Sequence, residues 1–199
     1  AAAGAAAREL GGPVALKAIA DGLVHRSDHG AVAVGLGSPS AVARAGRRMR
    51  RRLIDAGLRP RGFLVQAMAD PGVELLAGVV ADPTFGPVVA CAAGGTATEL
   101  LGEPAVRLTP LGLDEAEALV RSLRAFPLLD GFRGAPRCDV AAVGQVLARL
   151  AALADALPEL VELECNPVIA SPAGAVAVDA RARVRPPPPR PPAPAPRPS

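Results

Sequence analysis

Three short apolar segments separated by turn signals constrain the fold of this chain more than any other feature. The segments cover residues 62–68, 73–80 and 88–92. Asp70-Pro71-Gly72 separates the first two, and a turn that begins Asp-Pro occupies residues 82–87. Connections this short join neighbouring antiparallel strands, because a parallel crossover needs about a dozen residues or more. The pattern predicts an antiparallel sheet rather than an alternating βαβ fold.

Further strands are predicted towards both ends of the chain. Residues 14–20 and 32–36 form two apolar runs joined by a polar segment. Residues 159–170 and 175–184 form a final hairpin around a Ser-Pro-Ala-Gly turn.

Helices are predicted from their end signals. Residues 1–10 have a helical pattern that Gly11-Gly12 closes. Ser38 and Asp139 are typical N-caps of two longer helices, and Asp114 with Glu117 three residues later has the pattern of a capping box. Together with the strands, these helices predict an α+β fold.

The domain organisation follows from length and composition. The chain has 199 residues, half of them apolar, which fits one domain of residues 1–185. Residues 186–199 include nine prolines and no hydrophobic run, so they are predicted to form a disordered proline-rich tail. The chain has no initiator methionine and opens inside a predicted helix, so we expect that it begins partway through a larger domain.

Several classes of protein do not fit this composition. The net charge of +3 is too small to indicate a polyanionic partner, and no apolar run has the length of a membrane span, so neither nucleic acid nor a membrane is expected as partner. The three cysteines are far apart and predict reduced thiols in a cytoplasmic protein. The arginines of the helix after Ser38 fall on one side, which is either a solvated face or a patch for an anion.

Rare residue types are concentrated near the start of the chain. Residues 13–32 hold the only lysine, Lys17, and both histidines, His25 and His29. On a strand, Lys17 shares a face with Ala15 and Ile19. An ammonium group on a half-buried strand either meets a negative group or extends to solvent, and the sequence leaves both readings open.

The final hairpin carries a second polar group of residues. Glu162, Glu164 and Asn166 alternate on one side of its first strand, and Asp179 lies on the second. Carboxylate and amide oxygens suit a hard cation such as Mg²⁺. The same pattern is also typical of a solvent-facing hairpin, so spacing alone does not decide between the two.

Seven motifs, in chain order, resemble those of the ATP-grasp domain of ADP-forming acyl-CoA synthetases. The resemblance covers about residues 8–184. The motifs are PVALK at 13–17, HRSDHGAV at 25–32, LVQAM at 64–68 with Glu74 and Gly78, DPTFGP at 82–87, GG at 94–95 with Glu99, LDGFRG at 129–134 and ELECNP at 162–167.

This resemblance implies the ATP-grasp fold, in which two α+β lobes with antiparallel sheets and flanking helices hold a nucleotide; the N-terminal lobe of this chain is expected to be incomplete. Relatives such as acetate–CoA ligase (ADP-forming) and the succinyl-CoA synthetase beta subunit pass a phosphoryl group between nucleotide and acyl phosphate through a phosphohistidine. The implied cofactors are ATP or ADP and Mg²⁺. The implied partner is a CoA-binding ligase domain or alpha subunit, and the implied substrate is a small carboxylic acid.

The resemblance also implies a role for each matching residue. Lys17 would contact the nucleotide phosphates, the backbone of the linker from Gln66 to Ala69 would meet the adenine, and Glu74 would lie near the ribose. His25 would accept a phosphoryl group, and Glu164 would orient the phosphohistidine. The implied nucleotide-binding residues are Lys17, Ser27, Gly30, Gln66, Ala67, Met68 and Glu74; the implied metal ligands are Asn166 and Asp179; the implied catalytic residues are His25 and Glu164.

The chain also departs from the family pattern. Arg26 and Ala31 stand where the family usually has lysine and glycine. Two functions therefore stay under consideration. The first is an acid–CoA ligase module, and the alternative is a regulatory or degenerate nucleotide-binding module of a protein acyltransferase.

Overall fold

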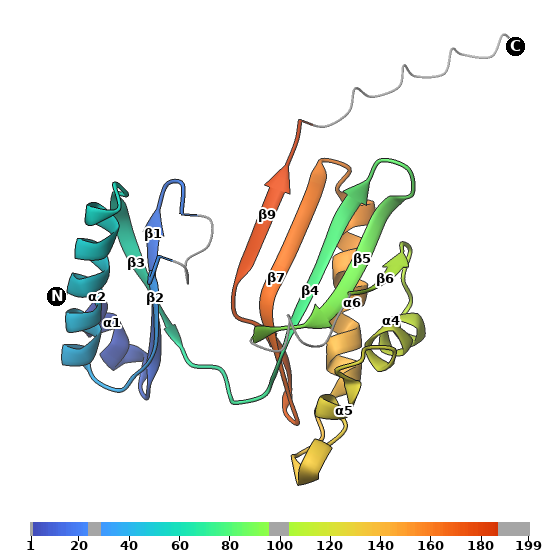
Figure 1. Ribbon diagram of the computed structural model, residues 1–199, viewed down its shortest axis with the longest axis horizontal. Helices are drawn as coiled ribbons and strands as arrows, with labels where there is room; N and C mark the ends of the chain where they lie inside the picture. The colour runs from blue at the N-terminus through green and yellow to red at the C-terminus, as the bar shows by residue number, and fades with distance from the viewer. Residues whose placement is uncertain (1, 24–28, 96–103, 187–199) are drawn as a thin grey trace, which may run out of the picture. The chain divides into compact units, whose positions relative to one another are not determined.

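The structure, a computed structural model, describes residues 2–23, 29–95 and 104–186. It divides into two compact units, Ala1–Ala69 and Asp70–Ser199, called here the N-terminal and C-terminal units (Figure 1). The sequence predicts one domain over residues 1–185, and that range is divided between these two units.

The N-terminal unit is a three-stranded antiparallel sheet with two helices. The strand order is β2-β1-β3. Its elements are α1 (Ala2–Leu10), β1 (Val14–Ala20), β2 (Val32–Leu36), α2 (Pro39–Asp55) and β3 (Pro60–Ala67). The Ser38 side chain accepts a hydrogen bond from the backbone N–H of Ala41 at 3.2 Å, which confirms the predicted N-cap.

Alternation along β1 decides what each face of this sheet carries. Val14 and Leu16 are fully buried in a cluster with Val42, Ala45 and Met49 of α2. Residues between them in the sequence point to the opposite face, because successive side chains of a strand alternate. We call the face of each sheet that points away from its packed helices the distal face.

The C-terminal unit is a larger antiparallel sheet backed by helices (Figure 1). The strand order is β6-β5-β4-β7-β8, and β9 also pairs with β7. Its strands are β4 (Val73–Asp82), β5 (Gly86–Ala93), β6 (Ala105–Leu108), β7 (Leu160–Ser171), β8 (Gly174–Ala177) and β9 (Ala180–Val184). Its helices are α4 (Leu113–Arg121), α5 (Phe126–Leu129), the 3₁₀ turn η2 (Phe132–Gly134) and α6 (Val140–Ala156).

One hydrophobic core holds this unit together. Leu75, Val89 and Val168 of the sheet and Leu119 and Leu147 of the helices are fully buried in it. Asp139 caps α6 as predicted, since its Oδ1 accepts the backbone N–H of Ala142 at 2.9 Å.

The prediction that Asp70-Pro71-Gly72 joins two paired strands is wrong. The strands before and after it belong to different sheets, because β3 pairs with β1 whereas β4 pairs with β5 and β7. The second predicted turn is confirmed: β4 and β5 form a hairpin, and Asp82 Oδ1 accepts the backbone N–H groups of Thr84 and Phe85. A turn signal shows that a strand ends, but not which sheet the next strand joins.

Two further sequence predictions need correction. Helix α4 begins earlier than Asp114, with Gly112 as its N-cap and the Glu115 side chain accepting the Gly112 N–H at 3.2 Å. The last predicted strand is divided into β8 and β9. Pro167 lies opposite the interruption, and it has no N–H with which to continue the ladder.

Among the described residues, no helix combines the length and apolar character that crossing a membrane requires. Cys91, Cys138 and Cys165 are free thiols, as predicted.

Candidate functional site

Lys17 lies on the distal face of the N-terminal sheet, between two apolar neighbours. It pairs in register with Val32 on β2 and Leu64 on β3, so these three side chains share one face. Ile19 follows on the same face and is about half exposed, as is Leu64. Lys17 itself is only 7 % exposed, so its side chain does not extend into solvent.

This arrangement suits a ligand with a flat apolar part and an anionic part. Apolar side chains can pack against an aromatic ring system, and a compact ammonium group is a point charge for phosphate. A cation in such surroundings interacts with an anion more strongly than it would in water.

Three further predicted residues lie at the end of β3. Gln66 pairs with Ala15 and therefore shares the face of Lys17, whereas Ala67 pairs with Val14 and points to the other face. The Met68 N–H donates to the Pro13 carbonyl at 3.3 Å, just beyond the end of the strand.

Gly30 is held in a backbone conformation that favours glycine. Its φ is 58°, and a Cβ atom added there would lie 2.8 Å from a guanidinium nitrogen of Arg52. The predicted His25 and Ser27 lie outside the described residues.

Glu74 lies on β4 in the C-terminal unit, next to the double glycine. The Gly94 N–H donates to the Glu74 carbonyl at 2.8 Å. A Cβ atom on Gly95 would lie 2.5 Å from a carboxylate oxygen of Glu74. The two glycines therefore allow the chain after β5 to pass close to Glu74.

Glu164 and Asn166 lie side by side on the distal face of the C-terminal sheet. Their strand neighbours Leu163 and Cys165 point to the core, so Glu164 and Asn166 point away from it. The Asn166 amide donates to Glu164 Oε1 at 3.0 Å. The backbone N–H of Asn166 donates to the Asp179 carbonyl at 3.1 Å, which places Asp179 directly across from it.

These residues fit a magnesium ion in their chemistry. Because the Asn166 amide nitrogen is engaged by Glu164, its oxygen is left as the acceptor for a cation. Asp179 adds a carboxylate, and both are oxygen donors of the kind that Mg²⁺ prefers. The described part of the chain holds no group of three or more His, Cys, Asp or Glu side chains arranged for a metal. Two protein ligands fit Mg²⁺ better than they fit a metal that needs a full protein cage.

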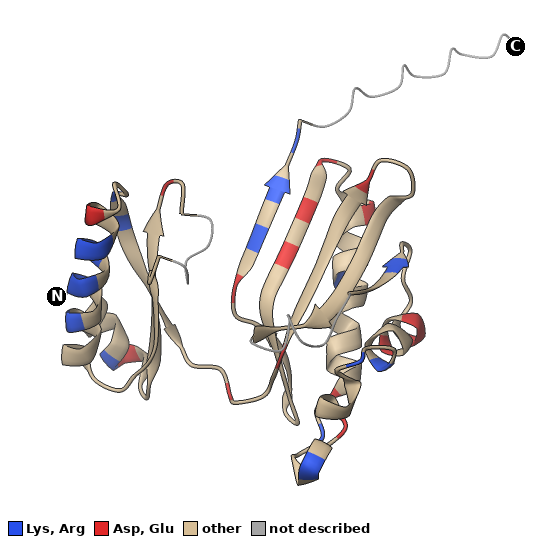
Figure 2. Ribbon diagram, in the orientation of Figure 1, with Lys and Arg blue, Asp and Glu red and all other residues tan. Residues whose placement is uncertain are grey.

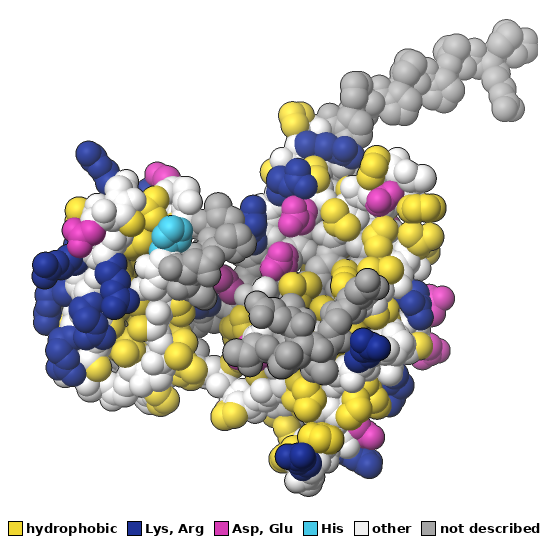
Figure 3. Space-filling view, in the orientation of Figure 1, with side chains coloured by type: hydrophobic (Ala, Val, Ile, Leu, Met, Phe, Trp, Pro, Cys, Tyr) yellow, Lys and Arg dark blue, Asp and Glu magenta, His cyan; other side chains and the backbone are white. Residues whose placement is uncertain are grey.

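Two arginines that no sequence motif marks lie opposite the glutamates. Arg181 pairs with Glu164, and Arg183 pairs with Glu162, so blue and red residues face each other along β9 and β7 (Figure 2). Figure 3 shows acidic and basic side chains gathered on this face of the unit. Counting back from the turn of the final hairpin would have placed these residues opposite one another.

The thiol beside Glu164 is in its neutral form. Burial raises the pKa of Cys165, and the neighbouring Glu164 carboxylate raises it further. Cys165 points to the core while Glu164 points away from it, so the thiol does not belong to the candidate site.

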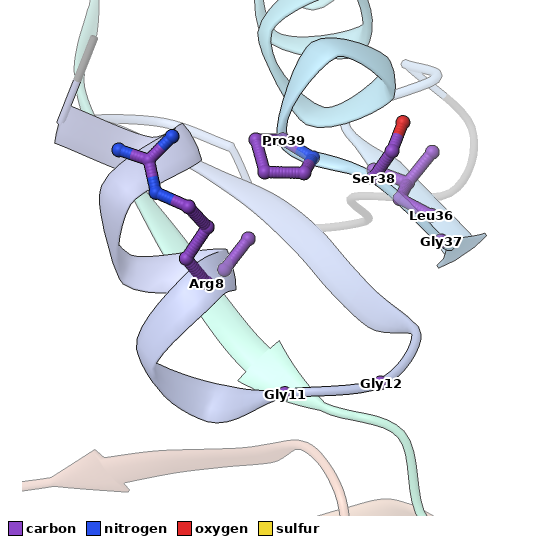
Figure 4. A pocket seen from close by; sticks show the side chains of 8 residues that line it. Arg8, Gly11, Gly12, Leu36, Gly37, Ser38 and Pro39 are labelled. Carbon is purple, nitrogen blue, oxygen red and sulfur yellow. The ribbon is translucent and has the colours of Figure 1, made fainter.

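A pocket of about 200 Å³ in the N-terminal unit contains none of the predicted site residues. Arg8, Gly11 and Gly12 line one side of it, and Ser38 and Pro39 at the start of α2 line the other (Figure 4).

Comparisons with known proteins agree with the two sheets and their motifs. A model of the ATP-grasp domain matches residues 1–184. The beta subunit of acetate–CoA ligase (ADP-forming) I from Pyrococcus furiosus is 32 % identical over 176 residues, which cover 86 % of this chain and 75 % of that subunit. Acetate–CoA ligase (ADP-forming) I from Archaeoglobus fulgidus is 35 % identical over 176 residues, or 87 % of this chain and 25 % of that protein.

A solved structure is similar over the same range. It is the dinucleotide-forming acetyl-coenzyme A synthetase 1 of Ca. Korarchaeum cryptofilum in complex with coenzyme A and Ca-AMPCP. Its TM-score is 0.88 at 38 % identity, covering 92 % of this chain and 81 % of that one. The same synthetase, bound to Mg-AMPPCP with its phosphohistidine segment pointing towards the nucleotide site, gives a TM-score of 0.79.

Proposed function

Because this chain belongs to the ATP-grasp family, in the group of the beta subunits of ADP-forming acetate–CoA ligases, we propose that it is the ATP-binding module of an ADP-forming acyl-CoA synthetase. In this proposal a phosphoryl group passes between ATP or ADP and an acyl phosphate through a phosphohistidine. The net reaction joins a small carboxylic acid to CoA and converts ATP to ADP and phosphate. A CoA-binding domain or alpha subunit supplies the CoA site.

The position of Lys17 is the observation that carries this proposal. It is the only lysine of the chain, and it lies almost fully buried between Val32 and Leu64 on an apolar sheet face. The ammonium group binds the nucleotide phosphates, and the apolar side chains around it, with the backbone of residues 66–68, contact the adenine. Glu74 contacts the ribose.

The C-terminal unit supplies the residues for the metal and for phosphoryl transfer. Asn166 and Asp179 hold Mg²⁺, which neutralises phosphate charge when it is bound. Glu164, oriented by the Asn166 amide, accepts a hydrogen bond from the histidine that carries the phosphoryl group. His25 serves as a second phosphoryl acceptor, because a neutral imidazole is a competent nucleophile near neutral pH.

The regulatory alternative has less support. The relatives described above are all named as acid–CoA ligases or synthetases. The sequence also contains the full set of implied site residues, which a degenerate module would not need: Lys17, His25, Glu164, Asn166 and Asp179.

Protein phosphorylation tests the reaction. The chain is mixed with its CoA-binding partner, Mg²⁺ and γ-labelled ATP, and acid-labile protein phosphate is measured. We expect label on the partner histidine and on His25, and loss of the His25 label in His25→Asn. ATP binding without any labelled histidine would contradict the enzymatic function and favour the regulatory one.

Lys17→Ala tests the nucleotide site itself. We expect the affinity for Mg-AMPPCP, measured by calorimetry, to fall by about tenfold or more, because a charge-assisted contact to phosphate is lost. Arg61→Ala is the matched control. It removes one exposed positive charge from the same sheet, where Arg61 pairs with Asp21, and should leave the affinity unchanged. Equal affinity of Lys17→Ala and wild type would discard the phosphate role of Lys17.

A further inference from the structure

Two arginines face two glutamates across the β7–β9 ladder, in the same register and on the same sheet face. Glu162 pairs with Arg183, and Glu164 pairs with Arg181. The next rung joins Asn166 to Asp179 through a backbone hydrogen bond. Arg181 therefore lies between the proposed metal ligands and the ion pair of Glu162 with Arg183.

The two arginines differ in what they contact. Arg183 is engaged by Glu162, with its Nε at 3.3 Å and an Nη at 3.2 Å from the same carboxylate oxygen. In the described part of the chain, no carboxylate lies within 4.0 Å of the Arg181 guanidinium, although Glu164 is its partner in the ladder. Glu164 is held by the Asn166 amide instead.

The negative charge of two carboxylates on this face favours a positive group beside them when phosphate binds. A polyphosphate that approaches Glu164 and Asp179 is repelled by both carboxylates. A bound Mg²⁺ offsets part of this repulsion, and a guanidinium beside the metal site offsets more of it. Arginine also presents a planar fork of N–H donors that matches two phosphate oxygens.

We infer that Arg181 binds a phosphoryl group over the distal face of the C-terminal sheet, next to Glu164 and Asn166. This inference rests on the proposed function, because it assumes that phosphate groups reach this face. Residues two positions apart on a strand are about 7 Å apart, so the extended Arg181 side chain can reach a phosphoryl group held near Asp179.

The phosphoryl group has two sources, the terminal phosphate of the nucleotide and the phosphorylated histidine segment. The chemistry of recognition is the same for both. If Arg181 binds the nucleotide phosphate, its loss weakens nucleotide binding even when the partner is absent. If Arg181 binds the phosphohistidine, its loss slows only the phosphoryl transfer, which needs the partner.

Arg181→Gln and Arg183→Gln form a matched pair of variants, since both remove one guanidinium from the same strand face. Calorimetry with the whole chain measures the affinity for Mg-AMPPCP and for adenosine, and γ-labelled ATP with the partner measures the rate of histidine phosphorylation. If the nucleotide is the source, Arg181→Gln weakens Mg-AMPPCP binding by about tenfold and leaves adenosine binding unchanged. If phosphohistidine is the source, binding is unchanged and the labelling rate falls by about tenfold. Either result supports the inference.

Arg183→Gln should keep both affinities within about twofold of wild type, because Arg183 is already paired with Glu162. Arg181→Lys, which keeps the charge without the fork, should lie between wild type and Arg181→Gln. The inference is overturned if Arg181→Gln binds and transfers like wild type, or if both glutamine variants have equal defects. Failure of the wild-type chain to bind Mg-AMPPCP would instead overturn the proposed function.

Discussion

At the scale of single residues, the side of a strand on which a residue lies decides its chemistry. Cys91 and Cys165 both pair with Ala77 and point into the core, whereas Glu164 and Asn166 on the same strand as Cys165 point away from it. Burial raises the pKa of both thiols, so they stay protonated and act as small apolar side chains. The polar chemistry of β7 is confined to its other face.

The pH dependence of stability tests the burial of Cys91. Burial raises its pKa from 9.0 to about 12. A thiol with a raised pKa in the folded state stabilises the fold fully below pH 9.0, and this contribution is lost as the pH rises towards about 12. Urea unfolding at about pH 8 and about pH 10.5 should show a loss of stability at the higher pH that is smaller in Cys91→Ala, which cannot ionise there. An equal loss in both proteins would mean that Cys91 is not buried as described.

At the scale of elements, helix starts were predicted where the N-cap residue has a polar side chain and missed where the N-cap is a glycine. Ser38 and Asp139 each accept a hydrogen bond from the N–H three residues later. Helix α4 begins at Leu113 after Gly112, which has no side chain to signal the cap. Asp114 then lies inside the first turn, where its charge interacts favourably with the helix dipole.

Replacing Asp139 and Asp114 in turn tests whether the first caps α6 while the second only carries a charge in the first turn of α4. Asp139→Ala should lower the free energy of unfolding by about 1 kcal/mol, because the Ala142 N–H loses its partner. Asp114→Ala should cost less than about half of that. Asp139→Asn, which keeps a cap oxygen, should stay close to wild type in urea unfolding. A larger loss for Asp114→Ala than for Asp139→Ala would contradict the helix starts described here.

At the scale of the whole molecule, the two units differ in core size and in charge. Counted over the described residues, the large core of 22 buried residues lies within the C-terminal unit, and the N-terminal unit has clusters of six and three. Residues 1–69 carry eleven Lys and Arg against four Asp and Glu, whereas residues 70–199 carry eleven against fifteen. Six of the arginines lie on α2 and are exposed (Figure 2).

The unequal cores predict unequal stability of the separate units. A fragment of residues 70–186 should unfold cooperatively when it is heated, because its core lies within it. A fragment of residues 1–69 should be marginal, since its clusters bury few side chains. Circular dichroism of both fragments during heating measures this. A non-cooperative transition of the larger fragment would show that its fold depends on the smaller one.

Much of the local structure and the composition of the candidate site could be predicted from the sequence. Strand alternation placed Lys17 opposite the helix-packed residues, and hairpin geometry placed Asp179 across from Asn166. These follow from the period of a strand and from short connections, which are properties of the chain itself. The ordered motifs then identified the family.

The pairing of distant strands was decided only by the tertiary structure. Asp70-Pro71-Gly72 separates two sheets instead of joining two strands, and β7 comes to lie beside β4 across about 80 residues of sequence. The backbone of a strand can form the same hydrogen bonds with any neighbouring strand. The neighbour is therefore selected by how the side chains of each sheet face pack against the helices.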